Sequence, residues 1–335
     1  MNVCPKYINK KIESTTNNKS ITGSILLAFS VVWCNGAQAE DKVLKPIDFG
    51  NQNTIFQAEI IRLGLEELGY TIQPSLEASP PLAHLAISQG DADYMAVHWE
   101  PLHDDYYSRA GGDDTMLKLG SLVDNALQGF LIDKRTSEQY DIKYLSQMSD
   151  PEIAALFDVD GDGKADLTGC NPGWGCEAII QDYVEDLSLE NTVDIRSGVY
   201  EALIADTLQN YKSGAPVLYF SWTPMWVNDV MIPGSDVVWL GIEKQDENND
   251  SDIHDLGFAP NTIKIIGNKD SMEEHPAAAS FLSLVSIDIK DINAENALIY
   301  NGEDTADDIE NHAKAWIEKN EKKFNEWISK AKEYK

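Results

Sequence analysis

Segments with the period of a β-strand alternate with segments with the period of an α-helix along this chain. Residues 54–68 place apolar side chains at helical spacing, and Gly69 stops this helix before a short strand at 70–72. A helix at 81–88 then precedes a buried strand at 94–97. The order repeats downstream with a strand at 193–195, a helix at 199–212 and a strand at 216–220. This alternation predicts an α/β fold.

Two tryptophans stand at the carboxyl ends of predicted strands, where ligands gather in α/β sheets. Trp99 follows the strand at 94–97, and Trp222 follows the strand at 216–220. A third, Trp174, lies among turn residues in Cys170-Asn-Pro-Gly-Trp-Gly-Cys176. Three indoles in such settings indicate an aromatic box for a cation.

The amino terminus has the features of an export signal. Four lysines precede an apolar run from Ile21 to Trp33, and Ala37-Gln38-Ala39 supplies the small residues that a signal peptidase accepts. We expect a signal peptide over residues 1–39, cleaved after Ala39. The apolar run is shorter than the ~20 residues of a membrane-spanning helix. A lipoprotein site at Cys34 is the alternative, but the bulky Trp33 precedes that cysteine.

The cysteines that remain after cleavage are Cys170 and Cys176. In an oxidising compartment they are expected to form a disulfide. The ring is short, so chain entropy gives it about 2–3 kcal/mol at most. We infer that the disulfide fixes local geometry more than global stability.

The chain is strongly acidic, with a formal net charge of −30. Residues 1–39 contain more lysine than acidic residues, so the mature chain is more negative still. Such a charge excludes nucleic acid as a partner.

The length of the chain suits two lobes better than one large core. Strand-like stretches at 129–133 and 262–266 are candidates for the crossings between the lobes, and the polar segment 246–255 is expected to be an exposed loop. The carboxy-terminal helix is expected to bury side chains at core spacing, namely Ile309, Trp316, Ile317, Phe324, Trp327 and Ile328.

Four motifs together resemble the periplasmic glycine betaine/proline betaine-binding proteins of enteric bacteria. They are Cys-Asn-Pro-Gly-Trp-Gly-Cys at 170–176, Trp-x-Pro-Leu-His-Asp at 99–104, Trp-Thr-Pro-x-Trp at 222–226 and Asp-Gly-Asp-Gly-Lys-Ala-Asp-Leu-Thr-Gly at 160–169. The resemblance covers almost the whole mature chain. It implies a two-lobed periplasmic binding protein fold of type II, with lobe I at 40–130 and 260–335, lobe II at 131–259, and the ligand cleft between them. It also implies a monomeric periplasmic receptor that serves the permease subunits of an osmoregulated ABC importer.

The same resemblance implies the ligand-binding residues. They are the box tryptophans Trp99, Trp174 and Trp222, with the His103 side chain and the backbone amides of Gly175 and Cys176 for a carboxylate. The chemistry agrees, because a trimethylammonium group has no hydrogen to donate and is best met by the faces of aromatic rings. A tight Gly-Cys turn presents adjacent N–H groups to a carboxylate, and the disulfide would hold them rigid together with Trp174.

Some neighbouring residues have a simpler interpretation. Trp226 is expected to pack, and His98 lies on the strand face opposite to Trp99, so we do not expect it to bind the ligand. For His103 the alternative is a histidine on the surface that caps a helix.

The run from Asp158 to Asp166 resembles the first part of a calcium-binding EF-hand loop. Its carboxylates Asp158, Asp160, Asp162 and Asp166 occupy positions one, three, five and nine, with glycine at six. Gly169 stands where the bidentate glutamate belongs, so the full motif fails. An acidic turn is the alternative, and any calcium here would be structural.

An enzyme and an adhesion module are the rival classes. Cys176 with His103 could form a thiol nucleophile and base, but a paired cysteine is unreactive, and the sequence contains no Gly-x-Ser-x-Gly, His-Glu-x-x-His or phosphate-loop motif. We therefore expect no enzyme and no cofactor, apart from the calcium alternative. A calcium-dependent structural module would be indifferent to betaine. The sequence does not rank glycine betaine against proline betaine, carnitine, choline or sulfur analogues, although choline lacks the carboxylate.

Overall fold

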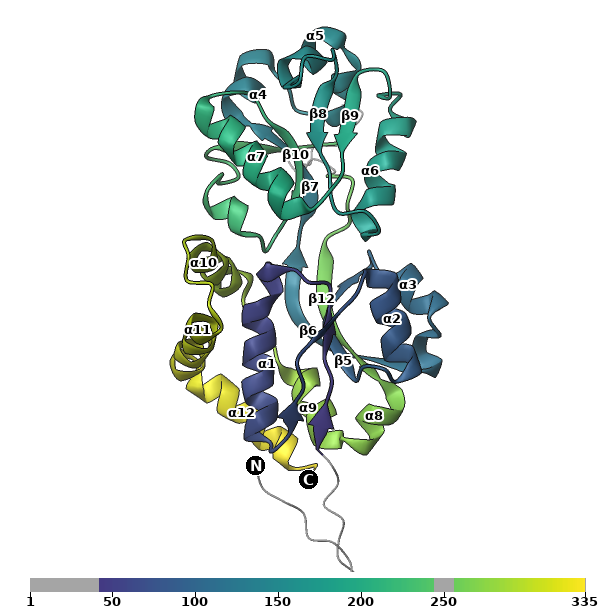
Figure 1. Ribbon diagram of the computed structural model, residues 1–335, viewed down its shortest axis with the longest axis vertical. Helices are drawn as coiled ribbons and strands as arrows, with labels where there is room; N and C mark the ends of the chain where they lie inside the picture. Colours follow the sequence, from purple (N-terminus) through teal and green to yellow (C-terminus); the bar gives the residue numbers. More distant parts are fainter. Residues whose placement is uncertain (1–41, 244–255, 335) are drawn as a thin grey trace, which may run out of the picture. The chain divides into compact units, whose positions relative to one another are not determined.

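The computed structural model describes residues 42–243 and 256–334 (Figure 1). The predicted signal peptide at 1–39, with Cys34, and the predicted polar loop at 246–255 lie outside the described residues.

The described residues form an α/β structure, as the sequence predicted. The strands are β1 (Val43–Leu44), β2 (Ile47–Asp48), β3 (Thr71–Ile72), β4 (Leu76–Glu77), β5 (Tyr94–Glu100), β6 (Met116–Ala126), β7 (Gln128–Asp133), β8 (Ala165–Thr168), β9 (Val193–Arg196), β10 (Leu218–Trp222), β11 (Val237–Leu240) and β12 (Asn261–Asn268). The α-helices are α1 (Ile55–Glu67), α2 (Pro80–Gln89), α3 (Asp104–Arg109), α4 (Lys134–Tyr140), α5 (Pro151–Ala154), α6 (Gly175–Asp186), α7 (Tyr200–Ser213), α8 (Lys269–Glu274), α9 (Pro276–Leu284), α10 (Ile289–Tyr300), α11 (Ala306–Lys319) and α12 (Glu321–Lys332). Short 3-10 helices are η1 (Gln52–Thr54), η2 (Gly112–Asp114), η3 (Leu145–Ser149), η4 (Ala155–Phe157) and η5 (Trp226–Asp229).

Two larger sheets organise these elements. A five-stranded sheet has the order β11-β7-β10-β8-β9, in which β8 is parallel to both β9 and β10, and β7 is antiparallel to β10 and β11. A three-stranded sheet has the order β5-β12-β6, with β12 antiparallel to both neighbours. Two short parallel pairs, β1-β3 and β2-β4, complete the strands. Strand β7 pairs on both sides and is buried along its whole length.

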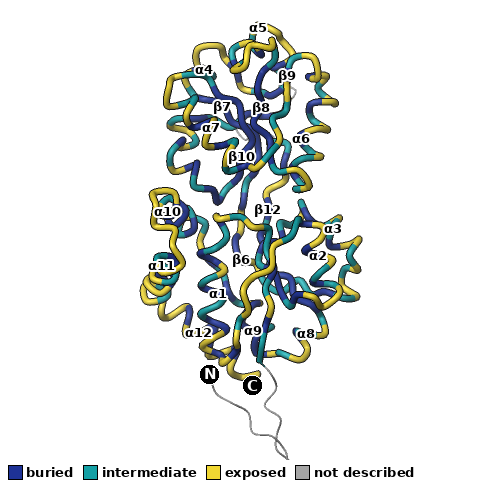
Figure 2. The backbone as a smooth tube through the Cα atoms, viewed as in Figure 1, coloured by how far each residue is buried: buried dark blue, intermediate teal, exposed yellow. Residues whose placement is uncertain are grey.

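The two larger sheets pack against separate hydrophobic cores. One core runs from Phe130 to Phe258 in the sequence and includes the side chains of β7, β8 and β10. The three-stranded sheet separates two others, because alternate side chains of β12 go to different cores: Ile265 to one and Ile266 to the other. Figure 2 shows β7, β8 and β10 of the five-stranded sheet as mainly buried and helix α11 as largely exposed.

The local signals in the sequence explain several element ends. Helix α2 begins with Pro80 at its first position and ends at Gly90, whose φ of 77° is the left-handed conformation that glycine adopts without strain. The helices predicted at 54–68, 81–88 and 199–212 correspond to α1, α2 and α7. The strand predicted at 216–220 is shifted to 218–222, so Trp222 is its last residue.

The prediction of one continuous carboxy-terminal helix is wrong. Asn320 has non-helical backbone angles, φ −108° and ψ 23°, and separates α11 from α12. The break lets both helices turn apolar faces to one core, where Trp316 and Trp327 stack with ring centroids 6.3 Å apart. The predicted packing role is confirmed, because Ile309, Trp316, Phe324, Trp327 and Ile328 are all buried and Ile317 is partly buried.

The chain passes from the three-stranded to the five-stranded sheet at Leu127, between β6 and β7. It returns between Leu240 and Asn261. The predicted crossing strands therefore begin directly after these passages, as β7 and β12. The lobe limits at 40–130, 131–259 and 260–335 stay a prediction that these boundaries support.

Candidate functional site

One cavity brings together all six residues predicted to bind a ligand. Its lining comprises Phe49, Asn51, Asn53, Thr54, Gln57, Pro80, Ala96, Val97, Trp99, Leu102, His103, Gln128, Trp174, Gly175, Cys176, Phe220, Trp222, Pro224 and Ile263. The lining comes from both larger sheets and from the start of α6, so residues far apart in sequence share one site.

The aromatic part of the cavity is held by packing. The rings of Trp174 and Trp222 meet edge to face, with centroids 5.7 Å apart. Trp222 is 5% exposed and also packs on Tyr200, with ring centroids 4.5 Å apart. Trp99 is partly buried and packs against the cores of both sheets. Trp99 and Trp222 lie on strands β5 and β10, and Trp174 is the residue directly before α6.

A tight turn after β5 ties His103 to Trp99. The backbone N–H of His103 donates to the Trp99 carbonyl at 2.7 Å, and the Trp99 N–H donates to His103 Nδ1 at 3.2 Å. Since Nδ1 accepts, the ring proton of neutral His103 is on Nε2. Burial, with smaller effects of His84 and His98, holds the pKa of His103 well below its usual value. His103 is 4% exposed, so the surface alternative is wrong.

The first turn of α6 supplies backbone donors. Gly175 and Cys176 are its first two residues, and the first N–H groups of a helix have no partner within the helix. This is the favoured place for an anion. Gly175 also lies close to Leu102, since a Cβ on Gly175 would be 2.9 Å from Leu102 Cγ.

A disulfide joins Cys170 and Cys176, as predicted, with Cα atoms 6.5 Å apart. Inside the ring, the Trp174 N–H donates to the Asn171 carbonyl at 3.1 Å. Asn171 Oδ1 accepts from the Tyr200 N–H at 2.7 Å, which fastens the ring to α7. The bond also removes the free thiol that the enzyme alternative requires at Cys176.

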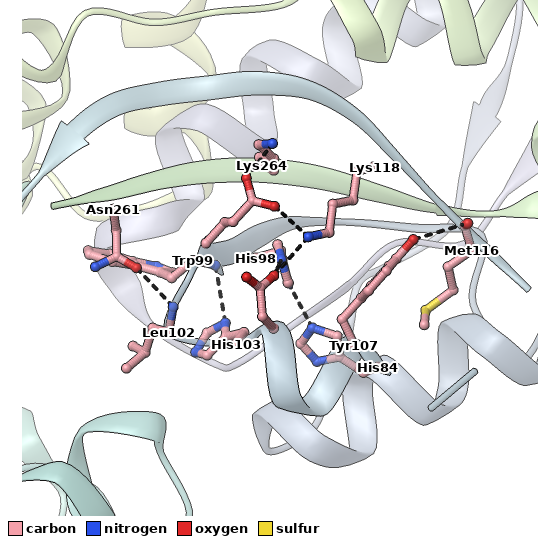
Figure 3. A network of polar contacts seen from close by, with 12 residues as sticks. His84, His98, Trp99, Leu102, His103, Tyr107, Met116, Lys118, Asn261 and Lys264 are labelled. Carbon is pink, nitrogen blue, oxygen red and sulfur yellow. Dashed lines mark hydrogen bonds and ion pairs between the residues drawn. The ribbon is translucent and has the colours of Figure 1, made fainter. Parts of the chain in front are cut away.

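Behind His103 lies a buried polar network (Figure 3). His84 Nδ1 donates to the Pro80 carbonyl at 2.6 Å, so His84 Nε2 accepts from His98 Nδ1 at 2.9 Å. Burial, together with the nearby His84 and Lys118, lowers the pKa of His98 to about 3. These imidazoles are neutral at physiological pH, and their rings pack edge to face around His103.

Two sets of residues in this network could in principle hold a metal ion. One nitrogen each from His84, His98 and His103 lie within 4.8 Å of one another, and His98 is similarly close to Glu100 and Asp104. In the first set the facing nitrogens of His84 and His98 already share a hydrogen bond. In the second, the Lys118 ammonium contacts both carboxylates (Figure 3). We therefore interpret both sets as hydrogen-bonded supports of the site. His98 does not line the cavity.

The acidic loop brings three of its four predicted ligands together. Carboxylate oxygens of Asp158, Asp160 and Asp166 lie within 4.8 Å of one another, and Asp162 is outside this group. Asp158 Oδ1 accepts from the Gly161 N–H at 2.7 Å, and Asp166 Oδ2 accepts from the Val159 N–H at 2.7 Å. These bonds are those of an acidic turn, and calcium binding at this loop stays a prediction.

The polar residues of the cavity wall were not among the ligand-binding residues predicted from the sequence. Asn53 lies in η1, Gln57 lies in the first turn of α1, and Gln128 is the first residue of β7. A signal was present: Gln57 is a polar residue three positions before Ile60, on the buried face of its helix, and Gln128 precedes four apolar residues of a buried strand. Trp226 does not line the cavity, and its ring stacks on Tyr300 with centroids 4.0 Å apart, which confirms its packing role.

In the part of the chain that the structure describes, the helices are too short or too polar to cross a membrane. The sequence of residues 44–319 matches the family described as the substrate binding domain of ABC-type glycine betaine transport system.

Among curated relatives, the chain is 41% identical to the glycine betaine-binding periplasmic protein OusX of Dickeya dadantii, over 91% of this chain and 96% of the relative. It is 42% identical to the glycine betaine/proline betaine-binding periplasmic protein of Salmonella typhimurium, over 86% of this chain and 89% of the relative.

Solved structures share the fold. An ABC-transporter choline binding protein in complex with choline gives a TM-score of 0.70 at 18% identity, covering 86% of this chain and 92% of that one. Lactococcal OpuAC in its closed-liganded conformation with glycine betaine gives 0.67 at 19% identity, covering 86% and 100%. With the family match over most of its length and relatives above 40% identity, the chain belongs to the family of substrate-binding domains of ABC-type glycine betaine transport systems.

Proposed function

We propose that this protein captures glycine betaine, or a betaine of similar size, in the cavity lined by Trp99, Trp174 and Trp222. The observation that carries the proposal is the presence in one cavity of an aromatic wall, a neutral imidazole and the start of a helix. The names of the relatives support the ligand class.

The aromatic wall suits the cation. A trimethylammonium group has no N–H to donate, so its diffuse charge is met by ring faces. Each desolvated cation–π contact contributes on the order of 1–2 kcal/mol, and three such contacts offset much of the cost of dehydrating the cation.

The polar corner suits a carboxylate. His103 Nε2 carries the ring proton, and Gly175 and Cys176 present adjacent N–H groups at the start of α6. Hydrogen bonds to a carboxylate are about twice as strong as neutral ones. The disulfide would keep Trp174 and these N–H groups in one rigid piece, which lowers the entropy lost on binding.

The cellular role follows from the same family. We propose a monomeric receptor that is exported after cleavage behind Ala39, works in the periplasm and delivers its ligand to the permease subunits of an ABC importer for osmoprotection. It has no catalytic role in this proposal. Light scattering of the exported protein, with its amino terminus sequenced, tests the monomer and the cleavage site.

Choline is the second candidate ligand, because a structure of the same fold is described as binding it. It lacks the carboxylate, so it would leave the His103 and α6 donors without a partner. Isothermal titration with glycine betaine and with choline separates the two. We expect glycine betaine to bind at least tenfold more tightly. Absence of heat and of a thermal shift with millimolar glycine betaine would refute the proposed function.

A further inference from the structure

Two buried polar atoms of residues that line the cavity have no hydrogen-bond partner. They are Oε1 of Gln57 and Nε2 of Gln128. The two side chains are 5% and 3% exposed. Buried polar atoms are nearly always paired, so an unpaired acceptor and an unpaired donor at one cavity indicate a missing partner.

The orientation of the Gln57 amide is fixed by a hydrogen bond to η1, which directly precedes α1. Its Nε2 donates to the Asn53 carbonyl at 2.9 Å, and Asn53 is held in turn by a hydrogen bond of 2.9 Å from its N–H to Asn51 Oδ1. Because a carbonyl can only accept, the nitrogen must face Asn53. The oxygen of Gln57 is therefore the end that needs a donor.

Gln128 lies beside the aromatic box. It is the register partner of Trp222 in the antiparallel pair of β7 and β10, so both side chains project from the same face of the sheet. Its amide is thus placed next to a wall that we propose for the cation.

Glycine betaine does not complete this arrangement. Its carboxylate and its trimethylammonium group contain no N–H or O–H, so it has nothing to donate to Gln57 Oε1. A hydroxyl can pair both atoms, since it donates one hydrogen bond, here to Gln57 Oε1, and accepts others, here from Gln128 Nε2.

We propose that Gln57 and Gln128 form a hydroxyl subsite of the cavity, an inference that rests on the proposed function. The hydroxyl is carried either by a hydroxylated betaine or by an ordered water that accompanies a betaine without one. In both cases it donates to Gln57 Oε1 and can accept from Gln128 Nε2.

The test uses two ligands that differ by one hydroxyl, L-carnitine and γ-butyrobetaine, with glycine betaine titrated in parallel. If the ligand supplies the hydroxyl, carnitine binds roughly tenfold more tightly than γ-butyrobetaine, because only carnitine pairs the buried oxygen. That ratio should fall to within twofold in Gln57→Met, and Gln128→Met is the second variant if the first is unstable. The exposed Gln52, next to the cavity wall, gives the control Gln52→Met, which should keep the ratio.

A crystal structure of the glycine betaine complex tests whether an ordered water supplies the hydroxyl. If water supplies the hydroxyl, the two ligands bind equally, and an ordered water lies within hydrogen-bond distance of Gln57 Oε1. The subsite is overturned if the ligands bind equally and no such water is present, or if the carnitine preference survives in both glutamine variants. Failure of glycine betaine to bind is a separate result, which refutes the proposed function itself.

Discussion

The N–H of Trp99 donates a hydrogen bond of 3.2 Å to Nδ1 of His103, so the aromatic wall and the polar corner of the cavity are joined within five residues. The bond fixes the imidazole with its proton on Nε2. Burial keeps the pKa of this ring well below the ordinary value of 6.5. His103 is therefore a neutral donor at physiological pH.

The first prediction concerns ligand affinity at the His103 donor. His103→Ala should weaken glycine betaine binding ten- to a hundredfold, the loss expected for a hydrogen bond to a charged group. Choline has no carboxylate and should lose less than threefold, which makes it the matched control. In the wild-type protein, affinity measured by calorimetry should change less than twofold from pH 8 to pH 5.5. A clear rise in affinity at the lower pH would mean that His103 becomes a cation, against its low pKa.

The second prediction concerns stability and pH. Burial first, then His84 and Lys118, lower the pKa of His98 to about 3, whereas the unfolded chain has a histidine pKa of 6.5. Glu100 has the opposite, smaller effect. Below pH 6.5 the unfolded state therefore binds a proton that the folded state does not, and the free energy of unfolding falls as the pH falls. The slope reaches about 1.4 kcal/mol per pH unit for each such histidine.

Urea denaturation at pH 7, 6 and 5 measures this slope. His98→Asn retains a polar side chain but cannot titrate, so its stability should fall less steeply than that of the wild type, by about one proton. If the free energy of unfolding falls equally with pH in the two proteins, His98 is protonated in the folded state or does not contribute to the pH dependence of stability.

The third prediction separates the aromatic wall from ordinary packing. Trp174→Leu keeps apolar volume but removes the ring face, so glycine betaine should bind at least tenfold more weakly. Trp239, a partly buried tryptophan of β11 that does not line the cavity, provides the control Trp239→Leu. Its affinity should stay within twofold. Trp222 is less suitable for this test, because its packing on Tyr200 means that truncation also costs stability.

The fourth prediction concerns the disulfide. Replacing Cys170 and Cys176 together with serine should lower the free energy of unfolding by at most about 2–3 kcal/mol, because the ring is short. Glycine betaine affinity should fall more markedly, since Trp174 and the α6 amides lose their shared constraint. The two quantities are measured by denaturation and by calorimetry on the same samples. A large loss of stability with unchanged affinity would assign the bond to the fold alone.

The sequence revealed the residues whose setting is local. Trp99 and Trp222 end apolar strands, and Trp174 stands between two cysteines, so each was recognisable without the fold. The break at Asn320 was not, because the apolar spacing continues through it and only the shape of the shared core requires the turn. Gln57 and Gln128 were also missed, since a single buried amide carries no motif. Their meeting at one cavity depends on how the sheets are arranged.

The last prediction tests the contact between the two halves of the polar corner. A Cβ on Gly175 would lie 2.9 Å from Leu102 Cγ, closer than such atoms approach, so the Leu102 side chain, the start of α6 or the turn that carries His103 would have to move. Gly175→Ala should therefore weaken glycine betaine binding, although the backbone of Gly175 is helical and tolerates alanine. Leu102→Ala removes the obstructing atom, and the double variant should regain most of the lost affinity. If the double variant binds no better than Gly175→Ala, the contact with Leu102 is not what sets the position of the α6 donors.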